Sequence, residues 1–319
     1  MYSQTAFKKK LILFLSVIAV LALAYTISLI IDSVRTGERQ SLYTWLAPRL
    51  AANADRIIIR HEGEKIEFVK RHDRWFVLSN EREFPARDLR VEDFIGTFTS
   101  RCVWPVRYTN PASHLRLGLS QDNASRVTIY ADNAVLLDVL VGFEDSINDE
   151  VFIRRFERNE ARSGNALVST YVRSSINSWY DLRLIPAADG GRIPADSIQR
   201  FSVSTSEGSQ VFIRQNRDWI ISGIEVENPD MSSIEGYVRF FLNLDGDDFT
   251  GINRDDPLLD YGIVVLEMGT GQQINIRFSE LDEETNRRYA HVSGTNHVFL
   301  LQQWASERFV RHPMDFETR

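Results

Sequence analysis

Ala54-Asp55-Arg56-Ile57-Ile58-Ile59 begins the stretch of sequence that decides the fold, and the stretch ends at Arg74-Trp75-Phe76-Val77. Between these runs lie a Glu62-Gly63 turn and an alternating segment that contains Ile66 and Phe68. Alternating apolar and polar residues that are interrupted by glycine and by polar turns are typical of β-hairpins. We therefore expect three consecutive strands, the last of which is led by Trp75.

The same series of features occurs a second time. Ala195-Asp196-Ser197-Ile198 is followed by a Glu207-Gly208 turn, by the alternating residues Val211 and Ile213, and by Trp219-Ile220-Ile221. A repeated order of strands and turns is typical of an internal duplication.

Two long offsets support the duplication. Trp75 and Trp219 are 144 positions apart. Gly118 of the step Leu117-Gly118-Leu119 and Gly262 of Tyr261-Gly262-Ile263 are also 144 positions apart. Equal offsets with the same order of elements favour a duplicated unit over chance.

An amphipathic helix is expected after each set of strands. Apolar residues occur twice at the spacing i, i+3, i+4 and i+7, which is typical of a helix with one buried face. They are Val91, Phe94, Ile95 and Phe98 in the first copy, and Ile234, Tyr237, Val238 and Phe241 in the second. Asp88 and Asp230 precede these stripes and are expected to be the N-caps.

Further strands are expected in each copy. Apolar runs of strand length cover residues 127–130 and 137–141 in the first copy, and residues 264–267 and 274–278 in the second. These runs extend each predicted sheet by two strands.

Each copy is expected to end in a strand and a short helix that carries a tryptophan. The strands are residues 167–170 and 298–301, and the tryptophans are Trp179 and Trp304. These tryptophans are only 125 positions apart, so we expect the second copy to lack part of a long polar loop, residues 142–164 of the first copy.

These patterns predict an α+β fold with two homologous modules after an N-terminal transmembrane helix. Each module is expected to be a mostly antiparallel sheet with two helices on one side. The modules cover residues 54–186 and 195–319. Residues 187–194 between them are rich in glycine, alanine and proline, a composition typical of a linker.

The N-terminus has the composition of a membrane anchor. Residues 11–31 are apolar throughout and follow Lys8, Lys9 and Lys10. A helix of this length spans about 30 Å, the hydrocarbon thickness of a bilayer. Because positive charge stays cytoplasmic, we expect residues 1–10 to form a cytoplasmic tail and residues 32–53 an external tether. A cleaved signal peptide is the alternative, but its apolar region is usually about 7–15 residues long.

Several short motifs accompany this membrane segment. They are Asp55-Arg56-Ile57, Trp75 after a charged turn, Leu117-Gly118-Leu119, Val139-Leu140-Val141-Gly142, and Trp179 with Leu182-Arg183. The combination resembles the bacterial domain-of-unknown-function family 4340 over nearly all of residues 54–319, and it departs from that family at Tyr261-Gly262-Ile263. The resemblance implies an accessory role in the cell envelope, because family members often accompany ABC transporter components of the gliding-motility type. It supplies no catalytic residues.

Composition limits the classes of partner. Without Lys8, Lys9 and Lys10 the chain has 34 basic and 44 acidic residues, a net charge of −10. This acidic balance argues against nucleic acid and against docking on anionic lipid. Cys102 is the single cysteine, so an intramolecular disulfide is impossible, and its position after a helical stripe predicts a buried structural thiol.

Metal-binding patterns are weak. His291 and His297 flank an expected turn and could chelate a metal, although exposed strand ends explain them more simply. The acidic run of residues 245–248, with Asp255 and Asp256, resembles calcium ligands in composition but lacks the EF-hand spacing. A helix C-terminus capped by Gly246 is the simpler explanation. We therefore predict no metal and no other cofactor.

Catalytic patterns are equally weak. The carboxylates Glu144, Asp145, Asp149 and Glu150 could support glycoside hydrolysis, but a charged surface loop explains them better. The sequence contains no nucleophile elbow and no phosphate-binding glycine loop. We predict that the chain is not an enzyme and has no catalytic residues.

The tryptophans have two possible roles, as sugar-stacking surfaces or as core residues. Trp75, Trp179, Trp219 and Trp304 occupy matching places in the two expected copies, which favours packing in the core, and the same is expected of Trp104. Trp45 is instead expected near the membrane surface.

Together these observations predict a single-pass protein of the bacterial inner membrane, with its N-terminus in the cytoplasm and its bulk outside. We expect a non-enzymatic scaffold or accessory subunit whose partner is an integral-membrane protein, such as a subunit of an ABC-type transport system. The alternative is a module that binds an envelope glycan or another extracytoplasmic ligand. Exposed tryptophans would favour this alternative, and buried ones would oppose it.

Overall fold

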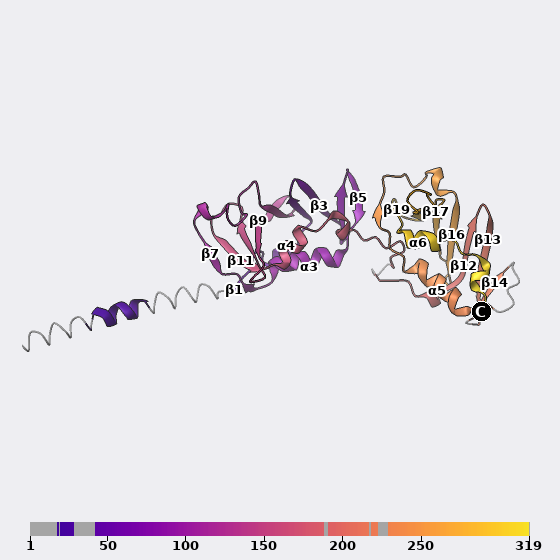
Figure 1. Ribbon diagram of the computed structural model, residues 1–319, viewed down its shortest axis with the longest axis horizontal. Helices are drawn as coiled ribbons and strands as arrows, with labels where there is room; N and C mark the ends of the chain where they lie inside the picture. Colours follow the sequence, from indigo (N-terminus) through magenta and orange to yellow (C-terminus); the bar gives the residue numbers. More distant parts are fainter. Residues whose placement is uncertain are drawn as a thin grey trace, which may run out of the picture. The chain divides into compact units, whose positions relative to one another are not determined.

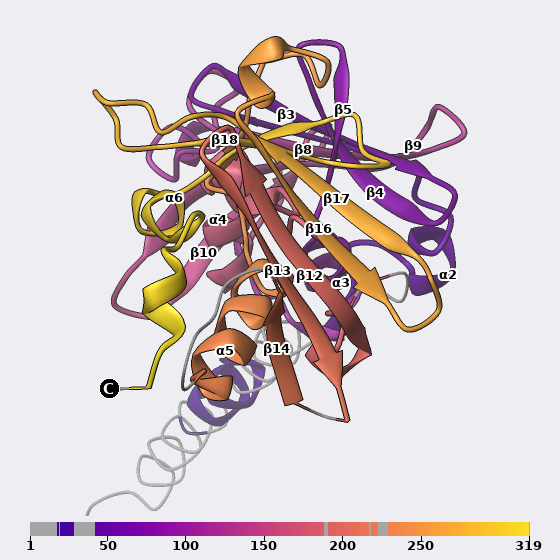
Figure 2. The ribbon, with the colours of Figure 1, turned by 90° about the vertical axis from the view of Figure 1, so that its right-hand side faces the viewer.

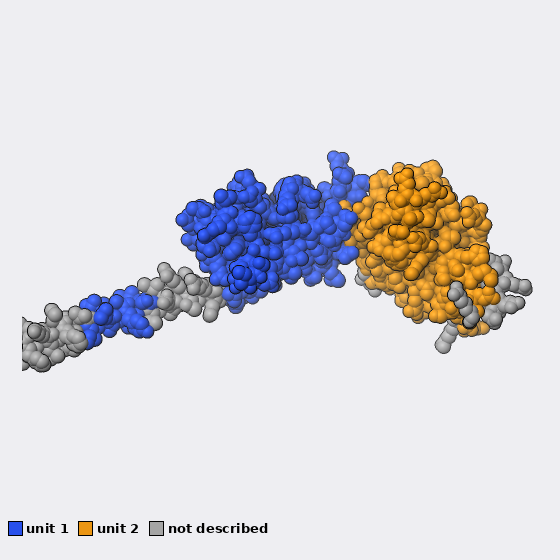
Figure 3. Space-filling model, viewed as in Figure 1, with its two compact units in different colours: residues 1–179 blue, residues 180–319 orange. Residues whose placement is uncertain are grey.

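The computed structural model describes residues 18, 20–28, 42–187, 191–216, 218–222 and 229–318. The chain divides into unit 1, residues 1–179, and unit 2, residues 180–319 (Figures 1 and 3). Each unit is built on one large antiparallel sheet with few helices, which confirms the sheet-dominated architecture predicted from the alternating segments.

Unit 1 has a nine-stranded sheet in the order β5-β4-β3-β2-β8-β9-β10-β11-β7 and a separate pair of short strands, β1 and β6. The strands are β1 (Leu42–Tyr43), β2 (Arg56–His61), β3 (Glu64–Arg71), β4 (Arg74–Ser79), β5 (Arg82–Pro85), β6 (Cys102–Val103), β7 (Val106–Tyr108), β8 (Ser125–Ala131), β9 (Ala134–Asp145), β10 (Glu150–Arg155) and β11 (Ala161–Asn165). The helices are α2 (Pro48–Ala51), α3 (Asp88–Thr99) and α4 (Leu167–Val172), with the 3-10 helices η1 (Pro111–Ser113) and η2 (Ile176–Trp179).

Unit 2 has an eight-stranded sheet in the order β14-β13-β12-β16-β17-β18-β19-β15. The strands are β12 (Ile198–Thr205), β13 (Gly208–Gln215), β14 (Asp218–Ser222), β15 (Asp248–Phe249), β16 (Gly262–Met268), β17 (Gln273–Phe278), β18 (Tyr289–Val292) and β19 (Val298–Leu300). The helices are α5 (Met231–Leu242) and α6 (Gln303–Arg308), with the 3-10 helices η3 (Ala195–Ser197), η4 (Pro257–Leu259) and η5 (Pro313–Phe316). Figure 2 shows α5 beside β12, β13 and β14.

The two sheets repeat one topology. If the edge strand β5 is left out, the strands of unit 1 follow the same order as those of unit 2. In unit 1 Ile57 of β2 pairs with Ile129 of β8, and in unit 2 Phe201 of β12 pairs with Leu266 of β16. Equivalent residues are therefore 144 positions apart in the first strand of each pair and 137 apart in the second. Between these two strands unit 2 is therefore seven residues shorter than unit 1.

The missing length does not lie where the sequence suggested. Residues 142–164, expected to be a long loop, instead include the end of β9, all of β10 and most of β11, which β17, β18 and β19 match in unit 2. The loss falls between β7 and β8. The pairing of Gly118 with Gly262 is also wrong, because Gly262 begins β16 and pairs with Phe278, whereas Gly118 lies in a turn before β8 with a φ of 68°.

The expected correspondence between the ends of the two units is also wrong. Residues 167–170 belong to helix α4, not to a strand, because Val168, Ser169 and Val172 are buried on one helical face. The backbone N–H of Arg87 donates to the carbonyl of Trp179 at 2.8 Å, and that of Asp230 donates to the carbonyl of Phe316 at 2.7 Å. The counterpart of Trp179 is therefore Phe316, and not Trp304.

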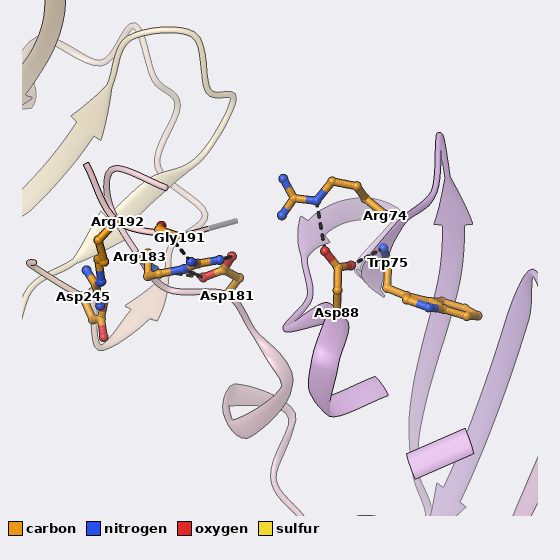
Figure 4. Close-up of polar contacts among 8 residues, drawn as sticks. All are labelled: Arg74, Trp75, Asp88, Asp181, Arg183, Gly191, Arg192 and Asp245. Carbon is orange, nitrogen blue, oxygen red and sulfur yellow. Dashed lines mark hydrogen bonds and ion pairs between the residues drawn. The ribbon is translucent and has the colours of Figure 1, made fainter. Parts of the chain in front are cut away.

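The two long helices bury the predicted stripes, and all eight stripe residues are buried. Asp230 is the N-cap of α5 and accepts hydrogen bonds from the backbone N–H groups of Ser232 and Ser233. Asp88 is not an N-cap: it is the first residue of α3, and its carboxylate accepts from the backbone N–H of Trp75 at 2.7 Å and from Arg74 at 3.1 Å (Figure 4). Asp88 therefore ties α3 to β4.

The structure places residues 42–53, expected in the tether, within unit 1. β1 pairs with β6, and Trp45 and Leu46 are buried. Unit 2 begins before the expected linker, at residue 180. Leu184 and Ile185 lie in its core, and Arg192 donates to Asp245 at 2.8 Å (Figure 4). These segments are held because their apolar side chains are buried.

Most of the expected anchor, residues 11–31, lies outside the described residues. Residues 20–28 are helical. No helix within the described part of the chain is long and apolar enough to cross a membrane.

Candidate functional site

The two histidines considered for a metal are used locally. His291 Nε2 lies 3.1 Å from the carbonyl oxygen of Thr295, across the turn that follows β18. The ring of His297 packs beside Phe249, with centroids 5.2 Å apart. Nowhere in the described residues do three His, Cys, Asp or Glu side chains converge as a metal site.

The acidic run near residue 245 forms ion pairs and turns. Asp247 accepts from Arg287 at 2.7 Å, and Asp256 caps η4 through the backbone N–H of Leu258. Gly246 does not cap α5, because the helix ends at Leu242 with Asn243 as its C-cap. The N–H of Gly246 instead donates to the carbonyl of Leu182 at 2.7 Å.

The four carboxylates around residue 147 belong to the hairpin of β9 and β10. Asp145 accepts from the backbone N–H of Ile147 and from Asn148 in the turn between β9 and β10. Glu150 binds Arg107 at 2.9 Å and accepts from Ser163 at 2.6 Å. Hydrogen bonds therefore engage Asp145 and Glu150 in holding this part of the sheet together.

Five of the six tryptophans are buried to at least 98%, as expected for Trp75, Trp104, Trp179 and Trp219. Trp45, which was expected near the membrane surface, is also buried inside unit 1. Trp304 is 47% exposed, which contradicts its predicted core role. The prediction of a buried thiol is wrong too: Cys102 is exposed, because α3 ends before it and β6 runs along the surface.

Two buried arginines serve the fold. Arg154 donates to the carbonyls of Leu119, Phe156 and Arg158 at 2.7–3.2 Å. Arg288 donates to the carbonyls of Ser279 and Ser306. Burial lowers the pKa of both guanidinium groups, and backbone oxygens offset the lost hydration of each charge.

Unit 1 has a groove between the β2–β3 turn and the segment that follows α4. Its volume is about 290 Å³, and Ile59, Ile66 and Val172 form the apolar part of its wall. The polar part consists of His61, Glu62, Glu64, Arg173, Ser174 and Ser175. His61 Nδ1 shares a 2.7 Å hydrogen bond with the hydroxyl of Ser125, which is buried and does not line the groove. Ser125 therefore orients the imidazole but is not placed as a nucleophile.

Unit 2 has a larger groove at the equivalent place, between the β12–β13 turn and the segment that follows α6. Its volume is about 460 Å³. The lining residues are Val203, Thr205, Glu207, Gly208, Ser209, Gln210, Val310, Arg311, His312 and Pro313. The side-chain amide of Gln210 donates to the carbonyl of Arg311 at 2.5 Å and joins the two walls. The carbonyl oxygen of that amide is buried and has no partner among the described residues.

The two grooves, called groove 1 and groove 2 below, occupy the same position in the repeated topology. Val203 in β12 is the counterpart of Ile59 in β2, and Arg311 is the counterpart of Ser174. The sequence signal for one wall was present in the turns Glu62-Gly63 and Glu207-Gly208. The sequence gives no sign of the other wall, because its residues follow α4 or α6 and lie too far from the turn along the chain for a local pattern to connect them.

Comparison of the chain with protein-family models, with curated proteins and with solved structures finds no match to any of them.

Proposed function

We propose that the chain is a membrane-anchored, non-enzymatic scaffold or accessory protein of the bacterial inner membrane. In this proposal residues 11–31 span the membrane, residues 1–10 lie in the cytoplasm, and both units lie outside. The units derive from a duplication, and they contact an integral-membrane partner such as a subunit of an ABC-type transport system. The resemblance to domain-of-unknown-function family 4340 is part of the same proposal.

The observation that carries the proposal is the repeated topology of two units that follow one apolar segment. Eight strands recur in the same order in both units, so the chain presents two related surfaces. The histidines, carboxylates and tryptophans with a possible role in chemistry are mostly held by contacts inside the units. This use of polar groups supports a binding or scaffolding role over catalysis.

The second candidate is a module that binds an extracytoplasmic ligand. It is favoured by the presence of a groove at the equivalent position in each unit. The burial of five tryptophans weighs against a glycan platform, because stacking on sugars needs an exposed aromatic face.

The membrane topology can be tested with Cys102, which is the single cysteine and is exposed. We expect a membrane-impermeant maleimide to label Cys102 of the full chain in intact spheroplasts. The matched control combines Cys102→Ser with Ser3→Cys, and we expect its label only after permeabilisation. Labelling of Ser3→Cys in intact cells, or protection of Cys102 until lysis, would overturn the proposed orientation.

The partner can be tested by affinity capture of the full chain from detergent-solubilised native membranes after cross-linking. We expect subunits of an ABC-type transport system to be enriched. A control chain keeps residues 32–319 and replaces residues 11–31 with an unrelated membrane segment of the same orientation. Enrichment that persists in this control assigns the contact to the two units, whereas recovery of the chain alone contradicts the scaffold proposal.

A further inference from the structure

Both units stack an arginine on the aromatic residue that closes the repeat. In unit 1 the Cζ atom of Arg90, from α3, lies 4.8 Å from the ring centroid of Trp179. The same guanidinium donates to the hydroxyl of Ser174, after α4, at 2.8 Å. The guanidinium of Arg90 therefore lies against the buried Trp179, and the residue in the wall of groove 1 is the serine Ser174.

Unit 2 makes the same contact, but the arginine and the serine have exchanged their positions in the fold. Arg311 follows α6 and lies over Phe316, with Cζ 4.7 Å from the ring centroid, while Ser233 on α5 faces its guanidinium at 3.4 Å. Ser233 stands where unit 1 has Arg90, and Arg311 stands where unit 1 has Ser174. The exchange places a cation in the wall of groove 2.

The guanidinium of Arg311 is loosely held by polar partners. Among the described residues its polar contacts are 3.4 Å to the Ser233 hydroxyl, 3.4 Å to the Asp315 carbonyl and 3.8 Å to the Asp315 carboxylate. By contrast, Arg214 binds Glu235 at 2.7 Å and Arg287 binds Asp247 at 2.7 Å in the same unit. An arginine that is fixed by its flat face while its N–H groups have only long contacts is suited to bind an oxyanion.

A second donor lies next to it. The Nδ1 atom of His312 accepts from the backbone N–H of Met314 at 3.3 Å, so in the neutral ring the proton is on Nε2. His312 is exposed and lines the groove together with the hydroxyl-bearing residues Thr205 and Ser209. Groove 2 therefore combines the Arg311 cation and neutral donors with one lining carboxylate, Glu207, around a volume of about 460 Å³, a size typical of small-ligand sites.

We propose that groove 2 binds a small soluble molecule through its carboxylate or phosphate group, with Arg311 as the principal contact and His312 as a second donor. The net charge of −7 on the whole chain disfavours an anionic membrane surface as the occupant. Groove 1 is not expected to bind the same group. Its lining has two carboxylates, Glu62 and Glu64, whereas groove 2 has one, Glu207.

The test is a titration of the full chain in detergent with inorganic phosphate and, separately, with acetate, at constant ionic strength set by sodium chloride. The chain has only four methionines, and Met314 adjoins groove 2 while Met231 and Met268 do not line it. With methyl-labelled methionine we expect the Met314 NMR signal to shift with one or both anions, while Met231 and Met268 stay constant. A response to phosphate alone or to acetate alone identifies the class of oxyanion.

Variants separate binding from folding. Arg311→Met is expected to raise the dissociation constant about tenfold or more, because a charged hydrogen-bonding partner is lost. Arg311→Lys keeps the charge and is expected to weaken binding less, which keeps the test valid if Arg311→Met unfolds unit 2. Arg308→Met removes the same charge outside the groove and is expected to leave binding unchanged. Absence of any Met314 shift, or equal binding by Arg311→Met and the unaltered chain, would overturn the site.

Discussion

Phe68 and Trp179 meet edge to face, with their ring centroids 4.9 Å apart, and this contact fastens the end of unit 1 to strand β3 of its sheet. Phe212 and Phe316 repeat the contact in unit 2 at 5.1 Å. Phe68 and Phe212 lie in equivalent strands, whereas the closing residue changes from tryptophan to phenylalanine. The repeat therefore preserves a packing position and not a residue type.

The closing residue is expected to be essential for stability. Trp179→Ala removes a fully buried indole and should lower the free energy of unfolding of unit 1 by about 3–5 kcal/mol. Trp304→Ala is the matched control, since Trp304 is 47% exposed and should change stability by less than about 1 kcal/mol. Denaturant unfolding of the two variants measures both values. Equal losses would contradict the assignment of Phe316, and not Trp304, as the counterpart of Trp179.

The exchanged arginine and serine predict a double-mutant result. Arg90→Ser should destabilise unit 1 by about 1–3 kcal/mol, because it removes a stacked cation and its hydrogen bond to Ser174. Adding Ser174→Arg recreates the arrangement of unit 2 and should restore part of this loss. Ser174→Arg alone should destabilise the unit, because it places a second cation beside Arg90. A double-mutant cycle from unfolding experiments should give a coupling of about 1 kcal/mol or more, and strict additivity would refute the equivalence.

Two glycines should respond to alanine with opposite signs. A Cβ on Gly164 in β11 would lie 2.3 Å from the ring of Trp104, so Gly164→Ala should cost about 1–3 kcal/mol through overpacking. A Cβ on Gly236 in α5 would meet no atom within 4 Å, and Gly236→Ala should stabilise unit 2 by about 0.5–1 kcal/mol. Thermal unfolding of both variants checks the signs. A neutral Gly164→Ala would mean that β11 does not approach Trp104 so closely.

Glu235 should make unit 2 sensitive to acid. Burial by itself raises the pKa of this carboxyl, but the hydrogen bond from Trp219 and the charges of Arg214 and Arg239 outweigh burial and lower it. A carboxyl with a lowered pKa stabilises the fold above its ordinary pKa of about 4.3, and the contribution is lost as the pH falls through the lowered value. Stability measured from neutral pH downwards should therefore fall more steeply for the unaltered chain than for Glu235→Gln.

Glu92→Gln is the control for this acid dependence. Glu92 occupies the equivalent position on α3 but is exposed. Because Glu92 is exposed, its loss should change the free energy of unfolding of unit 1 by less than about 0.5 kcal/mol. Similar pH profiles for Glu235→Gln and the unaltered chain would argue against the contact between Glu235 and Trp219.

The hairpins and long helices were predictable because their signal is local. Alternation identified β2, β3, β12 and β13, and the i, i+3, i+4, i+7 spacing identified the buried faces of α3 and α5. Strand β11, with the sequence Ala-Arg-Ser-Gly-Asn, lacks the apolar alternation that predicts a strand, and its place in the sheet comes from pairing with β10 and β7. The sequence of α4 predicts a strand because its β-branched residues favour one locally. The segment is helical because a helix buries Val168 and Val172 on one side.

The sequence alone determined that the chain carries an apolar N-terminal segment, two sets of hairpins and two amphipathic helices. Each of these features is encoded over one or two dozen residues. Tertiary structure alone decided that Phe316 replaces Trp179, that Arg311 and Ser233 exchange the roles of Arg90 and Ser174, and that each unit has a groove. The physical reason is that these partners are far apart in sequence and come together only in the folded unit. At these positions both units keep the same filled volume or stacked charge, although different residues supply it.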